Sequence, residues 1–172
     1  LELYPKVLVL SDEVYEYITF EKKHISIHHR EKLKNRSVSV SSFGKSFHIT
    51  GWKIGYLIAP EHLMIEIKKV HQFLVFSVNS IAQYAINDYM DLVQVSELGF
   101  FYQQKRDLFR NLMQNSKFEL LPCEGSYFQI ASYAAISDET DLDFTKRLVT
   151  EFGVATIPLS PFYADGKQTQ CI

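Results

Sequence analysis

The stretch SSFGKSFHITGWKIGY, from Ser41 to Tyr56, contains two lysines and no acidic residue. Lys45 directly follows a glycine, and Lys53 follows a tryptophan and precedes an apolar run. A buried lysine is costly unless another group offsets its charge. The stretch therefore points to a ligand at these lysines, either a phosphate or a carbonyl group, with ordinary surface lysines as the alternative.

Apolar runs flank this stretch on both sides. KVLVL (Lys6–Leu10) is continuous and rich in β-branched residues, which predicts a strand covered on both faces. SVSVSSF (Ser37–Phe43) alternates serine with valine and predicts a strand whose partner on one face is tight or polar. KIGYLIAP (Lys53–Pro60) predicts a third strand that ends at its proline.

From Glu61 onward the apolar spacing changes to three and four, which predicts helices over 61–74, 81–93 and 96–116. Two short strands around the turn at 122–125, a helix closed by Gly153 and a last strand over 154–163 complete the pattern. Buried strands followed by helices indicate the α/β class.

The composition excludes several classes of function. The chain has 172 residues, 47% of them hydrophobic, and a net charge of −2 without blocks of like charge, which argues against nucleic-acid binding and a polybasic membrane patch. No apolar run approaches the roughly 18 residues of a membrane span. Cys123 and Cys171 lack metal-ligand spacing, so we expect reduced thiols in a cytoplasmic protein.

Three polar clusters each lie at the end of a predicted strand. They are Asp12 with Tyr15, the segment Ser42–Lys45, and the surroundings of Lys53. In open α/β sheets, ligands gather outside the carboxyl ends of strands, so we expect these groups to meet in one crevice. Aspartate can hold a proton on a ring nitrogen, a phenol can bind a ring oxygen, and serine with lysine can bind phosphate. A lysine amine can form a Schiff base with a carbonyl once its pKa falls well below about 10.4.

Two motifs in this order, LSDEVYEYITF (Leu10–Phe20) and SFGKSFHITGWKIGY (Ser42–Tyr56), resemble the class I and II aminotransferases, which use pyridoxal 5'-phosphate (PLP) and have fold type I. The sequence is most similar to the branch of kynurenine and methionine aminotransferases. The likeness continues through KVHQFLVFSVNSIAQ, PCEGSYF and VATIPLSPFY, and so covers nearly the whole chain.

The resemblance implies a role for each residue of the clusters. Lys45 would form the Schiff base with PLP and would carry the proton between the substrate Cα and the cofactor C4′. Asp12 would pair with the pyridinium nitrogen, and Tyr15 would donate to the phenolate oxygen of the ring. Ser42 would hydrogen-bond the phosphate. Lys53, where many relatives carry arginine, would contact the phosphate as a point charge.

The resemblance also implies how the chain is organised. Residues 1–95 would form the C-terminal part of the PLP-binding large domain, with a mainly parallel sheet. Residues 96–172 would form most of a smaller α+β domain, truncated before its end, and the arginine that binds the substrate carboxylate would follow Ile172. The fragment alone would be inactive. The intact homodimer would transfer an amino group between an amino acid, of methionine, glutamine, kynurenine or aromatic type, and a 2-oxo acid.

Several alternatives remain open from the sequence. The GKS triplet would end a phosphate-binding P-loop only if residue 39 were glycine, and it is serine. Asp12 and Glu13 could be an ordinary solvated strand end. His24, His28 and His29 fit a surface loop better than a metal site, so no metal is expected. A PLP-dependent carbon–sulfur lyase of the same fold, or a non-catalytic fragment that only packs or binds a partner, would also carry these motifs.

Overall fold

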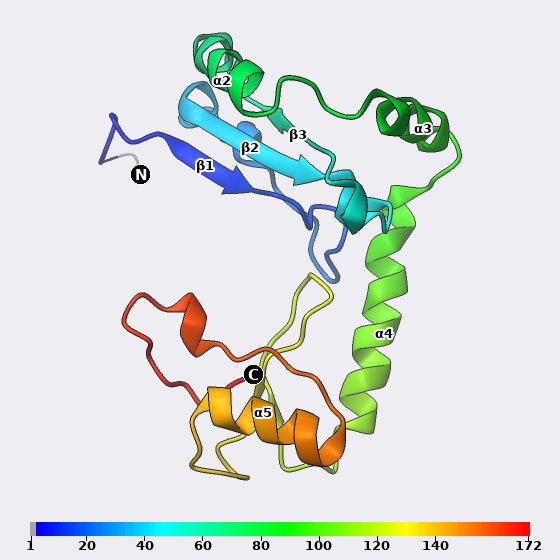
Figure 1. Cartoon of the computed structure of the whole chain (residues 1–172), viewed down its shortest axis with the longest axis vertical. Helices are drawn as coiled ribbons and strands as arrows, with labels where there is room; N and C mark the ends of the chain where they lie inside the picture. The colour runs from blue at the N-terminus through cyan, green and yellow to red at the C-terminus, as the bar shows by residue number, and fades with distance from the viewer. Residues whose placement is uncertain (1–2) are drawn as a thin grey trace. The chain divides into compact units, whose positions relative to one another are not determined.

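The computed structural model describes residues 3–172 and divides into two compact units, one up to Phe101 and one from Tyr102 to Ile172 (Figure 1). The division falls within helix α4 (Leu98–Leu112), which begins in the first unit and continues in the second. The sequence predicts a domain boundary between residues 95 and 96, a little before this division.

Three strands form the sheet of the first unit, in the order β1 (Val9–Asp12), β2 (Ser37–Ser42) and β3 (Gly55–Ile58). β1 and β2 are parallel, and their arrows point the same way in Figure 1. β2 and β3 are antiparallel, with Ser42 opposite Gly55. The predicted α/β class is confirmed, but these three strands form one parallel and one antiparallel pair, whereas the sequence predicts a mainly parallel sheet.

Strand β1 differs from the prediction in two ways. It begins at Val9 and ends at Asp12, so it lies further along the chain than the apolar run Lys6–Leu10 from which it was predicted. Leu8 and Leu10 are 60% and 73% exposed, because no element of residues 3–172 covers these side chains. The prediction of a strand covered on both faces is therefore wrong for this chain.

Strand β2 shows the predicted polar face. Its three serines at alternate positions are buried, and each hydroxyl has a hydrogen-bond partner. Ser37 Oγ donates to the carbonyl of Leu33 at 2.7 Å, and Ser39 Oγ lies 3.1 Å from His28 Nε2. Ser41 Oγ donates to a carboxylate that is described below. The intervening valines point to the opposite face of the strand.

The core of the first unit lies around a short helix, α1 (Phe43–Ser46), and helix α3 (Ser80–Met90). Phe47, Ile54 and Ile86 are its buried members. Pro60 ends the third strand segment as predicted, and α2 (Glu61–Leu74) starts directly after it. The side chain of Asn79 caps α3 by accepting from Ala82 N at 3.0 Å. The predicted helix over 61–74 is thus confirmed with the same bounds, and the predicted helix over 81–93 is confirmed with ends shifted by a few residues.

The second unit contains a two-stranded hairpin, β4 (Glu119–Leu120) and β5 (Ala131–Ser132), and helix α5 (Asp141–Phe152). Gly153 ends α5 in a left-handed conformation, with φ 68°, as predicted. The predicted strand over 154–163 is wrong. Pro158 and Pro161 remove two backbone donors there, and Ser160–Phe162 forms a single 3-10 turn, η5. Other 3-10 turns are η1 (Ile27–His29), η2 (Lys34–Arg36), η3 (Thr50–Trp52) and η4 (Val95–Glu97).

None of the helices over residues 3–172 combines the length and the apolar character that crossing a membrane requires.

Candidate functional site

Helix α1 determines where Lys45 points. Ser42 Oγ caps the helix by accepting from Gly44 N at 3.1 Å, and Phe47 N closes its single turn by donating to Phe43 O at 2.8 Å. Phe43 and Phe47, four residues apart, share one side of the turn and pack in the core. Lys45 lies between them in sequence, so helical geometry places it on the opposite side.

Lys45 is brought together with Tyr15. Its Nζ lies 5.7 Å from the centre of the Tyr15 ring. Tyr15 belongs to the turn that follows β1, which is closed by bonds from Glu16 N to Glu13 O and from Ile18 N to Tyr15 O, both 2.9 Å long. Residues separated by thirty positions therefore meet where β1 and β2 end.

Three further predicted contacts lie at the same edge of the sheet. Asp12 is the last residue of β1 and pairs with Val40 of the parallel neighbour β2, so both strands end side by side. Ser42 ends β2 opposite Gly55, the first residue of β3. Because Lys53 precedes Gly55 by two residues, it too lies here. We call this end of the strands, where β1 and β2 end and β3 begins, the sheet edge.

Two glycines make this close arrangement possible. A Cβ on Gly44 would lie 3.1 Å from both Ser42 Oγ and Thr50 Cα, so a side chain would push α1 away from the following turn. A Cβ on Gly55 would lie 2.4 Å from the carbonyl oxygen of Ser41, which only a backbone shift could relieve. Lys53, in between, has a left-handed backbone with φ 56° and ψ 41° and an exposed side chain.

Glu13 is buried, so the interpretation of a solvated strand end is wrong for this residue. Its Oε1 accepts from Ile27 N and its Oε2 lies against His24 Nε2, both at 2.9 Å. Burial raises the pKa of the Glu13 carboxyl, but the hydrogen bonds from Ile27 N and His24 outweigh it and lower the pKa from 4.5 to about 2. The carboxylate thereby anchors the loop between β1 and β2.

We expect Glu13 to make stability depend on pH. A carboxyl whose pKa is lowered in the folded state stabilises the protein above pH 4.5, and this contribution is lost as pH falls toward 2. Allowing for solvent around the partly exposed His24, it amounts to roughly 2 kcal/mol. Urea unfolding of the full-length Glu13→Gln variant should show that deficit at pH 7, and the deficit should shrink below pH 4.5. A deficit that stays constant down to pH 3 would contradict this assignment.

A second carboxylate, Glu16, supports the other side of the same turn. Its Oε1 accepts from Ser41 Oγ at 2.5 Å and from the Tyr56 hydroxyl at 2.6 Å. Sequence reasoning missed both anchors, Glu13 and Glu16. The available signal was their position in the sequence, since Glu13 directly follows Asp12 and Glu16 directly follows Tyr15.

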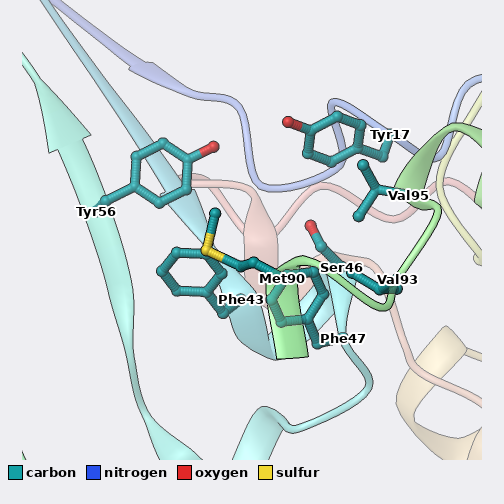
Figure 2. Close-up of a pocket in the computed structure, with 8 residues that line it drawn as sticks. All are labelled: Tyr17, Phe43, Ser46, Phe47, Tyr56, Met90, Val93 and Val95. Carbon is teal, nitrogen blue, oxygen red and sulfur yellow. The ribbon is translucent and has the colours of Figure 1, made fainter. Parts of the chain in front are cut away.

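A pocket with a volume of about 340 Å³ lies on the core side of α1, and Figure 2 shows the side chains that surround it. It contains none of the five predicted contacts and no charged side chain. Three hydroxyl side chains line it but no cation does, so this mostly apolar pocket is poorly suited to a phosphate group. Its lining consists of Tyr17, Phe43, Ser46, Phe47, Tyr56, Met90, Val93 and Val95.

Two histidines of the loop between β1 and β2 have structural partners. His24 contacts Glu13, and His28 Nε2 lies near Ser39 Oγ and 3.2 Å from the carbonyl of Ile58. Across residues 3–172, no three histidine, cysteine or acidic side chains are grouped so that they could hold a metal ion.

The sequence model of the aminotransferase class I and II family matches residues 2–171 of this chain. The chain belongs to this family. It is 48% identical over 163 residues to the methionine aminotransferase of Escherichia coli, a match that covers 93% of the chain and 42% of that protein. It is 32% identical to a kynurenine–oxoglutarate transaminase of Dictyostelium discoideum, over 95% of the chain and 42% of that protein.

Solved aminotransferase structures share the fold. The Escherichia coli protein YbdL, whose structure and reactivity identify a methionine aminotransferase function, superposes with a TM-score of 0.92 and 46% identity. This match covers 96% of the chain and 45% of YbdL. The chain thus spans less than half the length of the aminotransferases to which it is similar.

Members of this family use PLP, and the groups at the sheet edge fit this cofactor. Asp12 Oδ1 accepts from Val14 N at 3.2 Å, and within residues 3–172 its Oδ2 accepts no hydrogen bond. In the same part of the chain, the Ser42 hydroxyl acts only as an acceptor and Lys53 makes no ion pair. A carboxylate, a hydroxyl donor and an ammonium group thus remain for a ring nitrogen and a phosphate.

Proposed function

We propose that the full-length protein containing this chain transfers an amino group from an amino acid to a 2-oxo acid, with PLP bound at the sheet edge. The observation that carries the proposal is the approach of Lys45 Nζ to the Tyr15 ring, at 5.7 Å, at the edge that also carries Asp12, Ser42 and Lys53. The similarity to methionine and kynurenine aminotransferases supports it.

Each side chain would have a distinct task toward the cofactor. The Asp12 carboxylate would hold the proton on the ring nitrogen, and the Tyr15 hydroxyl would donate to the ring oxygen. The Ser42 hydroxyl and the Lys53 ammonium group would bind the phosphate, the latter as a point charge. When bound, PLP supplies an aldehyde that condenses with amines and a ring that accepts electrons.

Lys45 would carry the chemistry of the chain itself. Its Nζ would attach to the cofactor and, once displaced by the substrate amine, would act as the base that removes the proton from the substrate Cα. The same amine would then deliver a proton to the cofactor C4′. Asp12, by keeping the ring nitrogen protonated, would lower the energy of the charge that develops when Cα loses its proton.

Borohydride reduction of the PLP-loaded full-length protein, followed by peptide mapping, tests this proposal. We expect a pyridoxyl group on Lys45 Nζ and on no other lysine. The protein should also convert a 2-oxo acid to an amino acid when methionine or kynurenine is the donor. A label on another lysine overturns the assignment. Pyruvate and ammonia released from a cysteine conjugate without any 2-oxo acid would instead favour a carbon–sulfur lyase.

We further propose that the full-length protein is a homodimer. Large apolar side chains of α2, α3 and the segment between them are exposed, and Phe76 among them has a left-handed backbone with φ 61°, which is unusual for a bulky residue. The mass of the full-length protein measured by light scattering decides this, since a monomer would contradict it. These side chains are Phe73, Leu74, Phe76, Ile81 and Tyr84.

A further inference from the structure

Glu16 joins three elements through one oxygen atom. Its Oε1 accepts from Ser41 Oγ of β2 at 2.5 Å and from the hydroxyl of Tyr56, in β3, at 2.6 Å. Ser41 and Tyr56 are also cross-strand partners in the β2–β3 pair. The turn after β1 is therefore fastened to both neighbouring strands at a single point.

Each of these three elements carries part of the proposed PLP site. Tyr15 directly precedes Glu16 in the turn. Ser42 directly follows Ser41, and the helix that carries Lys45 begins there. Lys53 stands three residues before Tyr56, at the start of the third strand segment. A shift of the Glu16 carboxylate would thus change the relative positions of the ring-binding and phosphate-binding groups.

The surroundings of Glu16 favour strong hydrogen bonds. Ser41 is only 5% exposed. Burial and the hydrogen bond to Glu16 raise the pKa of Tyr56, so its hydroxyl remains a donor across the neutral range. The Tyr56 ring also lies beside the Phe43 ring of α1, with centres 5.3 Å apart, on the wall of the pocket in Figure 2. Hydrogen bonds to a charged acceptor are about twice as strong as those between neutral groups.

We propose that Glu16 is a positioning residue of the PLP site. Its carboxylate sets Tyr15 relative to Lys45 by fixing the turn after β1 against β2 and β3. The inference rests on the proposed function, because it assigns a role within that site. An apolar side chain of the same size would leave the hydroxyls of Ser41 and Tyr56 without an acceptor. The positioning role therefore depends on the charge of Glu16 and on its two hydrogen bonds.

The test uses the full-length protein with the Glu16→Gln substitution, which keeps the size and removes the charge. The dissociation constant of PLP is measured by titrating the visible absorption of the bound cofactor. Its orientation is followed by circular dichroism in the same band. We expect the dissociation constant to rise by about tenfold or more and the dichroic band of the loaded variant to change.

Glu13→Gln is the matched control. Glu13 lies in the same turn and is also a hydrogen-bonded carboxylate, but it binds the loop residues His24 and Ile27, which carry no proposed PLP contact. We expect this variant to lose stability while its dichroic band stays that of the wild type. A purely structural role of Glu16 predicts the same result for both variants, and that outcome would overturn the inference.

A double-mutant cycle with Tyr15→Phe tests the route of the effect. If Glu16 acts by placing the Tyr15 hydroxyl, the Glu16→Gln substitution should raise the dissociation constant by less in the Tyr15→Phe background than in the wild type. Full additivity would show that Glu16 does not act through Tyr15. Tyr56→Phe and Ser41→Ala each remove one donor and should have smaller effects of the same kind. They carry the test if Glu16→Gln fails to fold.

The controls separate this inference from the proposed function. A wild-type protein that binds no PLP and gains no label on Lys45 would refute the proposed function, whatever Glu16 does. A wild-type protein that binds PLP, with a Glu16→Gln variant of unchanged affinity and unchanged dichroism, would overturn only the positioning role.

Discussion

Replacing Lys45 by alanine in the full-length protein should lower amino-group transfer by roughly 10³-fold or more, since acid–base catalysis alone typically contributes about 10²–10⁴-fold. Under the proposed function, the substitution would remove both the amine that attaches to PLP and the base that takes the substrate proton. Turnover measured with methionine and a 2-oxo acid checks the result. The label from borohydride should disappear from the peptide around residue 45.

The structure indicates that this loss would not come from unfolding. Lys45 is partly buried, and α1 is held by Phe43 and Phe47 on its other side. We therefore expect the unfolding free energy to change by no more than about 0.5 kcal/mol. Lys68→Ala, on an exposed position of α2, is the control and should leave turnover unchanged. A Lys45→Ala enzyme with more than a tenth of the wild-type turnover would refute the role of Lys45.

The Asp12→Asn variant should lose turnover by roughly 10²–10³-fold, the usual cost of removing one group that stabilises charge in the transition state. Asparagine has the same size but no charge, so it cannot keep the proton on the ring nitrogen of PLP. Its side-chain oxygen can still accept from Val14 N, and Asp12 is exposed, so the fold should not change. Steady-state turnover at saturating PLP measures the effect.

Asp88→Asn provides a comparison for Asp12, because Asp88 is an exposed acidic residue on α3 and is not among the proposed PLP contacts. It should keep wild-type turnover and a wild-type spectrum of bound PLP. If Asp12→Asn also kept wild-type turnover and spectrum, the result would refute the proposed contact between Asp12 and the ring nitrogen.

The fold could be predicted where the spacing of apolar residues agrees with the residues that begin or end an element. Strand β2 follows from serine–valine alternation, and α2 follows from its apolar spacing after Pro60. The segment 154–163 was wrongly predicted as a strand from its apolar residues. Pro158 and Pro161 lack the backbone N–H groups that strand pairing requires. The exposure of β1 could not be predicted, since it depends on which elements lie beside its apolar side chains.

The candidate site was accessible to sequence reasoning because its proposed contacts follow strand ends. Asp12 follows an apolar run by two residues, Ser42 lies at the end of the serine–valine run, and Lys45 comes three residues later, so sheet geometry predicts that they lie at one end of the sheet. The carboxylates that support them could not be recognised in this way. Glu16 meets Tyr56 across forty positions of sequence and Glu13 meets Ile27 across fourteen, and such pairings are settled only when the chain folds.

The serines of β2 have one more consequence. The hydroxyls of Ser37, Ser39 and Ser41 form hydrogen bonds with three separate segments. Their partners are Leu33, His28 and Glu16. If the strand slid by a single position, valines would face those segments and all three hydroxyls would lose their partners together. The spacing of these serines therefore permits a single register of β2, and this register fixes the position of Lys45, four residues after Ser41.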